Sequence, residues 1–118
     1  MEREIVNEYG KIIIDKEVIA TLAGIAATEC FGIVGMASKK ISHGIAELLG
    51  KDALSKGVEI VEKDGRMVIQ VHIIVGYGTK MSEIAQNVIS NVKYVVESFT
   101  GLQVDQVQVN IQGVRMVD

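Results

Sequence analysis

The sequence has 118 residues, enough for one domain, and because 48% of them are apolar and 23% are charged, a disordered chain is excluded. One cysteine excludes a disulfide framework, and a net charge of -3 without a dense basic segment argues against nucleic acid as a partner. The N-terminal segment lacks the basic and apolar parts of a signal peptide, and no apolar run approaches the ~20 residues of a membrane helix, so we expect a cytoplasmic protein without a membrane span.

The first two predicted elements are a short strand over 8–14 and a helix that starts after Asp15. Asp15 follows three β-branched residues, and its carboxylate can accept hydrogen bonds from the free N–H groups of a helix N-terminus. The small side chains of this helix, with Gly24 among them, predict that another element approaches it closely. We expect the helix to run to about residue 29, with an apolar stripe made of Val18, Leu22 and Ile25/Ala26.

Three short elements are predicted in the middle of the chain. A strand over 33–36 is followed by an amphipathic helix over 38–50, which carries His43 on its polar side and has Ser38 as a suitable cap. A loop over 51–57, flanked by glycines, then leads to the second half of the sequence.

A β-hairpin is predicted where two β-branched segments flank the dipeptide Asp64-Gly65. Its strands cover 58–63 and 66–75, and both residues of the dipeptide adopt positive φ readily, which suits a type I′ turn. Alternation along the second strand sends its apolar side chains to one face, which we expect the helices to cover.

The end of the chain combines the longest helical pattern with a strictly alternating strand. Apolar residues recur at helical spacing over about 80–100, and Gly101 is placed to end that helix. The last strand covers 107–112, with one buried face and one face in solvent. Strand, helix and strand thus occur twice, which predicts a single α+β domain over 1–118. We expect a two-layer sandwich in which helices pack on one face of a small mixed, mostly antiparallel sheet.

Polar residues gather on the face of the sheet that the helices are not expected to cover. If the last strand neighbours the hairpin, its outward side chains join those of the hairpin in an amide-rich patch made of Gln70, His72, Gln106, Gln108, Asn110 and Gln112. Such a patch can hydrogen-bond a protein partner without desolvating much charge, although an ordinary solvated sheet face is the alternative. The polar side of the long helix, with Tyr94, is the second candidate partner surface.

The turn before the long helix is a candidate anion site made of Gly76, Gly78, Thr79 and Lys80. Free backbone N–H groups at the start of a helix can hold an anion, and Lys80 lies beside them. The spacing matches neither a dinucleotide-binding fingerprint nor a P-loop, so an ordinary strand-to-helix turn is the alternative.

No catalytic, cofactor-binding or metal-binding residue is predicted, and we therefore expect no enzyme and no cofactor. His43 and His72 have no cysteine or carboxylate at ligand spacing and belong to no recognisable catalytic arrangement. Cys30 is expected to be a buried structural thiol. Glu59 and Glu62 fall on opposite faces of a strand, so they do not form an acid/base pair by themselves.

Several short motifs, taken in order, resemble the alkaline shock protein (envelope stress response) family of Gram-positive bacteria, and the resemblance covers nearly the whole chain. The motifs are Tyr9-Gly10-Lys11-Ile12, Glu17-Val18-Ile19, Gly32-Ile33-Val34-Gly35-Met36, Gly76-Tyr77-Gly78, Thr100-Gly101-Leu102 and the segment 107–114. One departure is Ser82, which stands where family members often have proline at the start of the long helix.

The resemblance implies a small, non-enzymatic cytosolic protein that is linked to cell-envelope stress and homeostasis. It also implies docking on a protein partner, because larger relatives reach the membrane through a membrane-anchored one. The alternative is an accessory protein that binds a small anionic or fatty-acid-related metabolite at the turn over 76–80. The resemblance leaves a homo-oligomer open.

Overall fold

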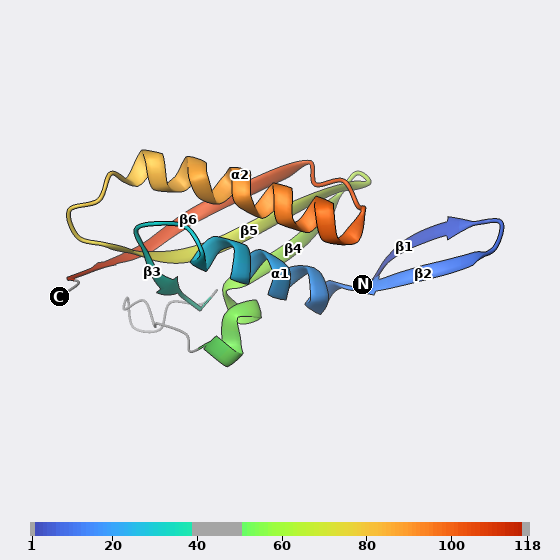
Figure 1. The fold of residues 1–118 in the computed structure, drawn as a ribbon, viewed down its shortest axis with the longest axis horizontal. Coiled ribbons are helices and arrows are strands. Elements are labelled where there is room, and N and C mark those ends of the chain that lie inside the picture. The colour runs from blue at the N-terminus through green and yellow to red at the C-terminus, as the bar shows by residue number, and fades with distance from the viewer. Residues whose placement is uncertain (1, 39–50, 117–118) are drawn as a thin grey trace.

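The computed structural model describes residues 2–38 and 51–116 (Figure 1). The predicted helix over 38–50, with His43, therefore lies outside the described residues except at its first position. In chain order the elements are β1 (Glu2–Asn7), β2 (Gly10–Asp15), α1 (Lys16–Thr28), β3 (Ile33–Met36), the 3₁₀ helix η1 (Lys51–Gly57), β4 (Val58–Lys63), β5 (Arg66–Gly76), α2 (Met81–Thr100) and β6 (Gln106–Arg115).

Strand β5 is the centre of the main sheet and pairs with three other strands. It pairs antiparallel with β4 along its first half and with β3 along its second half. It pairs in parallel with β6 over 68–76, which overlaps both of the other pairings. Because one strand has two edges, β3 and β4 share one edge of β5 and β6 takes the other.

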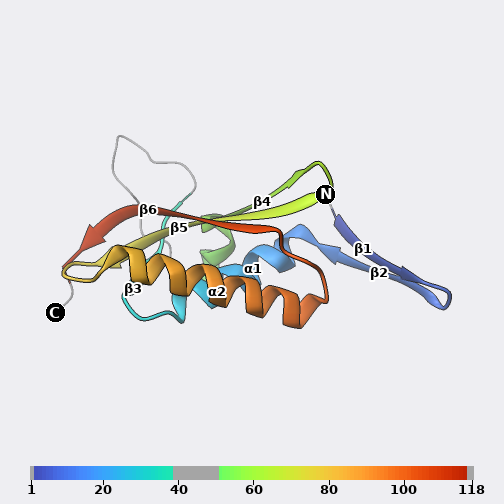
Figure 2. The same cartoon turned by 90° about the horizontal axis from the view of Figure 1, so that it is seen from above.

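Helices α1 and α2 cover one face of this sheet, so the molecule has two layers (Figures 1 and 2). Helix α2 makes the crossover that two parallel neighbours, β5 and β6, require. The core between the layers is continuous and is built largely of fully buried side chains that include Ile19, Met36, Met67, Ile69, Ile73, Val88 and Val92. The predicted α+β class, with helices on one face of a mixed sheet, is confirmed.

The first 15 residues differ from the prediction because they form a separate hairpin. The predicted strand over 8–14 begins only at Gly10, and it pairs with β1 rather than with the main sheet. Glu8 and Tyr9 form the turn, which the Asn7 side chain holds by accepting hydrogen bonds from the N–H groups of Tyr9 and Gly10 at 2.8 and 3.0 Å. Strand β1 was not predicted because its first three residues are charged and give no apolar alternation.

Helix α1 begins as predicted, and its buried stripe overlaps the predicted one in part. The Asp15 carboxylate accepts a hydrogen bond from the N–H of Glu17 at 3.2 Å and caps the helix. Ala26 is buried and Leu22 packs half-buried against the core, as predicted, whereas Val18 and Ile25 are exposed. The other buried side chains of the helix are those of Ile19, Ala20, Ala23 and Ala27. Small alanines score weakly in a hydrophobic pattern, although they permit the closest approach to the sheet.

The segment over 51–57, predicted to be a loop, is the 3₁₀ helix η1, and it packs on α1. At Gly24 the two elements are so close that an added Cβ atom would lie 3.0 Å from Cβ of Leu54. This contact confirms the predicted close approach to α1.

The two sharpest turn predictions are confirmed. Asp64 and Gly65 have φ values of 54° and 75°, as a type I′ turn between β4 and β5 requires. Gly101 adopts φ 76° and donates its N–H to the carbonyl of Glu97 at 2.9 Å, which ends α2.

Candidate interaction surfaces

The six polar residues of the predicted sheet patch lie together on the face opposite the helices. The register pairs Gln70 with Gln108 and His72 with Asn110, and Val71, between Gln70 and His72, points into the core. Two contacts link the side chains within β6 and across to β5. The Gln108 amide donates to Oδ1 of Asn110 at 3.2 Å, and Nε2 of Gln112 lies 3.1 Å from Nδ1 of His72. We name these six residues the amide face.

Exposure varies along the amide face. Gln106 and Gln108 are exposed, whereas His72 is only 9% exposed. Glu59, on β4, pairs with Gln70 and is exposed at the border of the face. The accessible part therefore lies near the start of β6, where a shallow pocket of about 440 Å³ is lined by Asp64, Arg66, Val68 and Gln106.

Tyr94 does not belong to the amide face. It is exposed on α2, which covers the other side of the sheet. The two predicted candidate surfaces, the sheet patch and the polar side of the long helix, therefore lie on different layers: six residues form a contiguous set on the sheet, and Tyr94 lies on the helix layer. Alternation assigns a side chain to a face of its own element, but it does not show which layer of the fold that face belongs to.

The predicted anion site is a compact turn in which the side chains of Thr79 and Lys80 have partners, whereas no side chain caps the N-terminus of α2. The Thr79 hydroxyl donates to the carbonyl of Gly76 at 2.6 Å, and Gly78 has a φ of 90°. Nζ of Lys80 lies 3.7 Å from a carboxylate oxygen of Glu83, in the first turn of α2. A carboxylate at this position repels an anion, and the anion site stays a prediction beside the ordinary turn.

An apolar pocket of about 450 Å³ adjoins this turn and was not predicted from the sequence. It lies between the α1–β3 and β5–α2 connections, and the rings of Phe31 and Tyr77 are both exposed at it. Its other lining residues are Gly32, Ile33, Val34, Gly76 and Thr79. The isolated aromatic residues gave no periodic signal from which the pocket could have been inferred.

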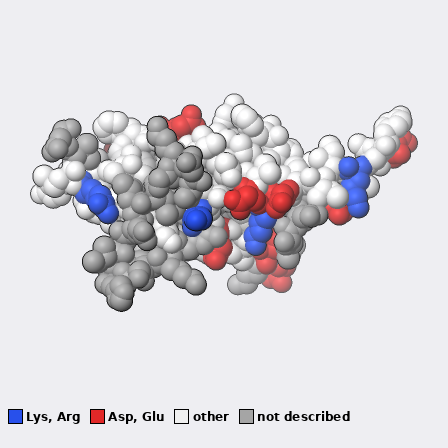
Figure 3. Space-filling model, turned by 90° about the horizontal axis from the view of Figure 1, so that it is seen from below, with Lys and Arg blue, Asp and Glu red and all other residues white. Residues whose placement is uncertain are grey.

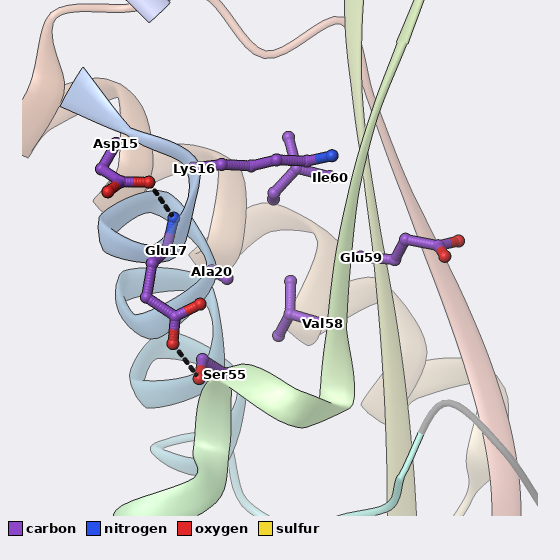
Figure 4. A pocket seen from close by; sticks show the side chains of 8 residues that line it. All are labelled: Asp15, Lys16, Glu17, Ala20, Ser55, Val58, Glu59 and Ile60. Atoms are coloured by element: carbon purple, nitrogen blue, oxygen red, sulfur yellow. Dashed lines mark hydrogen bonds between the residues drawn. The ribbon is translucent and has the colours of Figure 1, made fainter. Parts of the chain in front are cut away.

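A further pocket, of about 290 Å³, lies where α1, η1 and β4 meet (Figure 4). Glu17 is tied to η1 because its carboxylate accepts a hydrogen bond from the Ser55 hydroxyl at 2.6 Å. Lys16 contributes a positive charge to the lining, and Asp15 and Glu17 contribute negative ones, whereas the Glu59 side chain points away from the pocket (Figure 4). The hydrogen bond gives Ser55 and Glu17 a structural role, which connects η1 to the start of α1.

The thiol of Cys30, at the end of α1, is held by structural contacts. Burial raises the pKa of the Cys30 thiol, an effect that the hydrogen bond with Asn91 partly offsets. Sγ of Cys30 lies 3.6 Å from the carbonyl oxygen of Ala26, which also accepts a hydrogen bond from the Asn91 amide at 2.7 Å. Among residues 2–38 and 51–116, no three His, Cys, Asp or Glu side chains are grouped so that they could hold a metal ion.

Charge is mixed over the side of the molecule shown in Figure 3, where acidic and basic side chains lie next to one another among the coloured residues. None of the helices in the described ranges is both long enough and apolar enough to cross a membrane.

Comparisons with known proteins agree on one family. A family model matches residues 4–116, that of the alkaline shock protein 23 family, described by its cell envelope-related function. The uncharacterized protein YloU of Bacillus subtilis is 48% identical over 119 residues, which cover 100% of this chain and 99% of that protein. The uncharacterized protein Spy1614 of Streptococcus pyogenes is 39% identical over 118 residues, covering 99% and 98% of the two chains. No solved structure matches this chain.

Proposed function

Because this chain belongs to the alkaline shock protein 23 family, which has a cell envelope-related function, we propose that it is a non-enzymatic module that docks on a protein partner. The partner we propose is a membrane-anchored protein, met at the cytoplasmic side of the envelope. The observation that carries this proposal is the amide face: a contiguous, amide-rich set of polar side chains on the side of the sheet opposite α1 and α2.

The amide face suits protein docking because the desolvation cost of burying amide groups in an interface is low. Amide groups offer both donors and acceptors, and burying them against matching groups avoids the desolvation of full charges. The contact between Gln108 and Asn110 orders part of the face before a partner arrives, which lowers the entropic cost of binding. Interfaces of this kind carry about one hydrogen bond per 100–200 Å².

The non-enzymatic part of the proposal is supported by the surroundings of Cys30 and His72, whose thiol and imidazole are groups that enzymes use in catalysis. The raised pKa of Cys30 leaves less thiolate, the nucleophilic form, at neutral pH. His72 is 9% exposed, with its Nδ1 beside the Gln112 amide, so its ring is held within the sheet face rather than in an open cleft.

A charge-insertion experiment tests the docking surface. Gln106→Lys with Gln108→Lys adds two positive charges to the exposed end of the amide face. Gln86→Lys with Asn87→Lys adds the same charge to exposed positions of α2 and serves as the matched control. Tagged wild type and both variants would be recovered from the source cell after cross-linking, and bound proteins would be quantified by mass spectrometry.

We expect at least a tenfold loss of a specific membrane-anchored partner with the sheet variant and retention of it with the helix variant, because inserted charge must be desolvated in the interface. Equal recovery of the same partner with all three chains would place the contact elsewhere. Loss with the helix variant alone would transfer the docking site to the side that carries Tyr94.

The alternative function, binding of an anionic or fatty-acid-related metabolite, is favoured by one observation, the apolar pocket beside the turn over 76–80. Its volume of about 450 Å³ lies within the usual range for small-ligand sites. A rise in melting temperature with a medium-chain fatty acid, absent in Lys80→Ala, would support this alternative. A melting temperature that is unchanged by fatty acids and inorganic phosphate would exclude it.

A further inference from the structure

Strand β6 forms an edge of the main sheet that is not protected against the addition of a further strand. Within the described ranges β6 pairs with β5 alone, and it has no charged residue or proline from Gln106 to Val114. On the opposite edge of the sheet, β3 has only four residues and β4 carries Glu59 and Glu62. Because short length and charge are the usual protection of edge strands, β6 is the edge open to a further strand.

The turn between β4 and β5 determines which backbone groups of β5 point toward β6. Lys63 and Arg66 flank this two-residue turn and form a bonded pair, so the next residue, Met67, directs its N–H and C=O away from β4. Met67 bonds on that side to Asp105, which directly precedes β6. Its N–H donates to the Asp105 carboxylate at 2.7 Å, and its carbonyl accepts from the Asp105 N–H at 3.0 Å. The odd-numbered residues of β5 therefore bond to β6.

The parallel register then leaves a row of outward backbone groups on β6. In a parallel ladder a residue bonds to the two neighbours of the residue with which it pairs. Ile69 pairs with Val107 and so bonds to the backbone of Gln106 and Gln108. The residues whose N–H and C=O groups are directed away from β5 are Val107, Val109 and Ile111. Another extended backbone matches the spacing of these donors and acceptors.

The two faces beside this edge specify the side chains that an added strand should carry. Val109 and Ile111 are half-buried and pack against the core on the side that α2 covers, so apolar side chains gain by covering them. On the other side, the amide face reaches the edge at Gln108 and Asn110. The matching segment therefore alternates apolar residues with uncharged polar ones.

We propose that the partner contributes an extended segment of this alternating kind, which adds to the β6 edge as a further strand of the main sheet. This inference rests on the proposed function, because the segment belongs to the same membrane-anchored protein that docks on the amide face. Backbone hydrogen bonds along the edge supply affinity, and the alternate side chains supply specificity. The docking surface then consists of a sheet edge together with a sheet face.

A synthetic peptide tests the edge without knowledge of the partner. It has about nine residues, the length of the uncharged part of β6, with threonine and valine in alternation and a lysine at each end for solubility. Val109→Pro removes an outward N–H of β6 and spares the bonds to β5. Val109→Ala keeps that N–H and is the matched control for lost side-chain area. Circular dichroism and the melting temperature establish that each variant is folded.

Fluorescence anisotropy of the labelled peptide measures binding. We expect the peptide to bind the wild type and Val109→Ala, and to bind Val109→Pro about tenfold more weakly, because a backbone hydrogen bond at the edge is lost.

Two N-methylated peptides test the geometry of the added strand. Methylation of the valines removes one alternate set of N–H groups, and methylation of the threonines removes the other set. Only one set faces β6, so one methylated peptide should bind and the other should not. The peptide that binds also reveals whether the strand adds in parallel or antiparallel orientation.

Amide hydrogen exchange locates the contact on the chain itself. The outward N–H groups of Val107, Val109 and Ile111 should exchange about tenfold more slowly when the peptide or the captured partner is bound, because they become hydrogen-bonded. The N–H groups of Gln108 and Asn110 bond to β5 and serve as the internal reference. Docking through side chains alone would leave the outward groups unchanged.

Three results would overturn the proposal. Equal binding of both methylated peptides, or unchanged exchange of the outward N–H groups with both peptide and partner, would show that no strand is added to β6. Slower exchange in the concentrated chain alone would show that a second copy occupies the edge. Capture of a partner that depends on the amide face but leaves the outward N–H groups unchanged would remove the strand and retain the proposed function.

The opposite result separates the two proposals as well. Slower exchange with the peptide, without capture of any membrane-anchored protein, would contradict the proposed function and retain strand addition. If Val109→Pro does not fold, the methylated peptides and the exchange measurement on the wild type provide the test.

Discussion

The main body and the N-terminal hairpin bury apolar side chains to very different extents. In the body, β5 lies between strands on both edges and beneath two helices, and its inward side chains are fully buried. In the hairpin, β2 has three consecutive isoleucines, yet two of them are exposed. The same residue type thus stabilises the domain in one region and remains exposed in the other.

The most direct test of this difference in burial is a matched pair of substitutions that shorten one isoleucine side chain in each region. Ile73→Ala in β5 empties a fully buried position and should lower the free energy of unfolding by about 2–5 kcal/mol. Ile12→Ala in β2 removes the same atoms from an exposed position and should cost less than about 1 kcal/mol in dilute, monomeric protein. Urea unfolding of both variants measures the difference. Similar losses would mean that the hairpin is packed in solution.

Glycines provide a second comparison of the two regions. A Cβ atom added at Gly57 would lie 2.7 Å from the carbonyl oxygen of Ala37, so Gly57→Ala should cost about 1–3 kcal/mol through overpacking. At Gly10, in the hairpin, an added Cβ meets no atom within 4 Å. Gly10→Ala should therefore leave the melting temperature nearly unchanged, and a large drop there would contradict the open environment described for β2.

The junction between the regions should show a smaller effect. Asp15→Ala removes the cap of α1 and should cost about 1 kcal/mol, whereas Asp15→Asn keeps a side-chain acceptor and should preserve most of the stability. Thermal unfolding followed by circular dichroism measures both. If the asparagine variant loses as much as the alanine variant, the Asp15 carboxylate has a role other than capping.

The smallest expected effect concerns Cys30, at the end of α1. Its raised pKa should make alkylation by iodoacetamide near pH 8 slower in the folded chain than in the same chain in urea. The difference between the two rates should become smaller at higher pH. Because the folded pKa lies above the unfolded one, the protonated thiol favours the folded state, and this contribution is lost as pH rises above the unfolded pKa. Equal alkylation rates in both states near pH 8 would contradict this environment.

Strong periodicity explains which parts of the fold the sequence predicts. The β4–β5 hairpin and α2 each combine a regular apolar period with a glycine at a turn or a helix end, and β6 alternates strictly between apolar and polar residues over 107–112. The buried stripe of α1 was predicted only in part: Ala26 and Leu22 face the core, but Val18 and Ile25 are exposed, because the alanines that widen the buried side are weak hydrophobic signals. Strand β1 was missed because its charged residues resemble those of a solvated terminus.

The candidate surfaces show the same limit. Alternation placed the amide-face residues on one side of their strands, and the pairing of Gln70 with Gln108 brings those strands together. Period alone could not relate Tyr94 to that face, because it contains no information on how layers stack. The apolar pocket between Phe31 and Tyr77 joins two turns that are distant in sequence, so only the folded chain reveals it.

The position of β5 between all the other strands of the main sheet also has a kinetic consequence. Its pairing with β4 closes across a two-residue turn, whereas its pairings with β6 and β3 close loops of about thirty residues or more. The entropy cost of closing a loop comes before the stabilising contacts that the closed loop allows. We therefore expect the β4–β5 hairpin to form early and β3 to join late. On this view β5 is the nucleus of folding as well as the centre of the sheet, and substitutions at Val61 should slow folding while substitutions at Met36 should mainly speed unfolding.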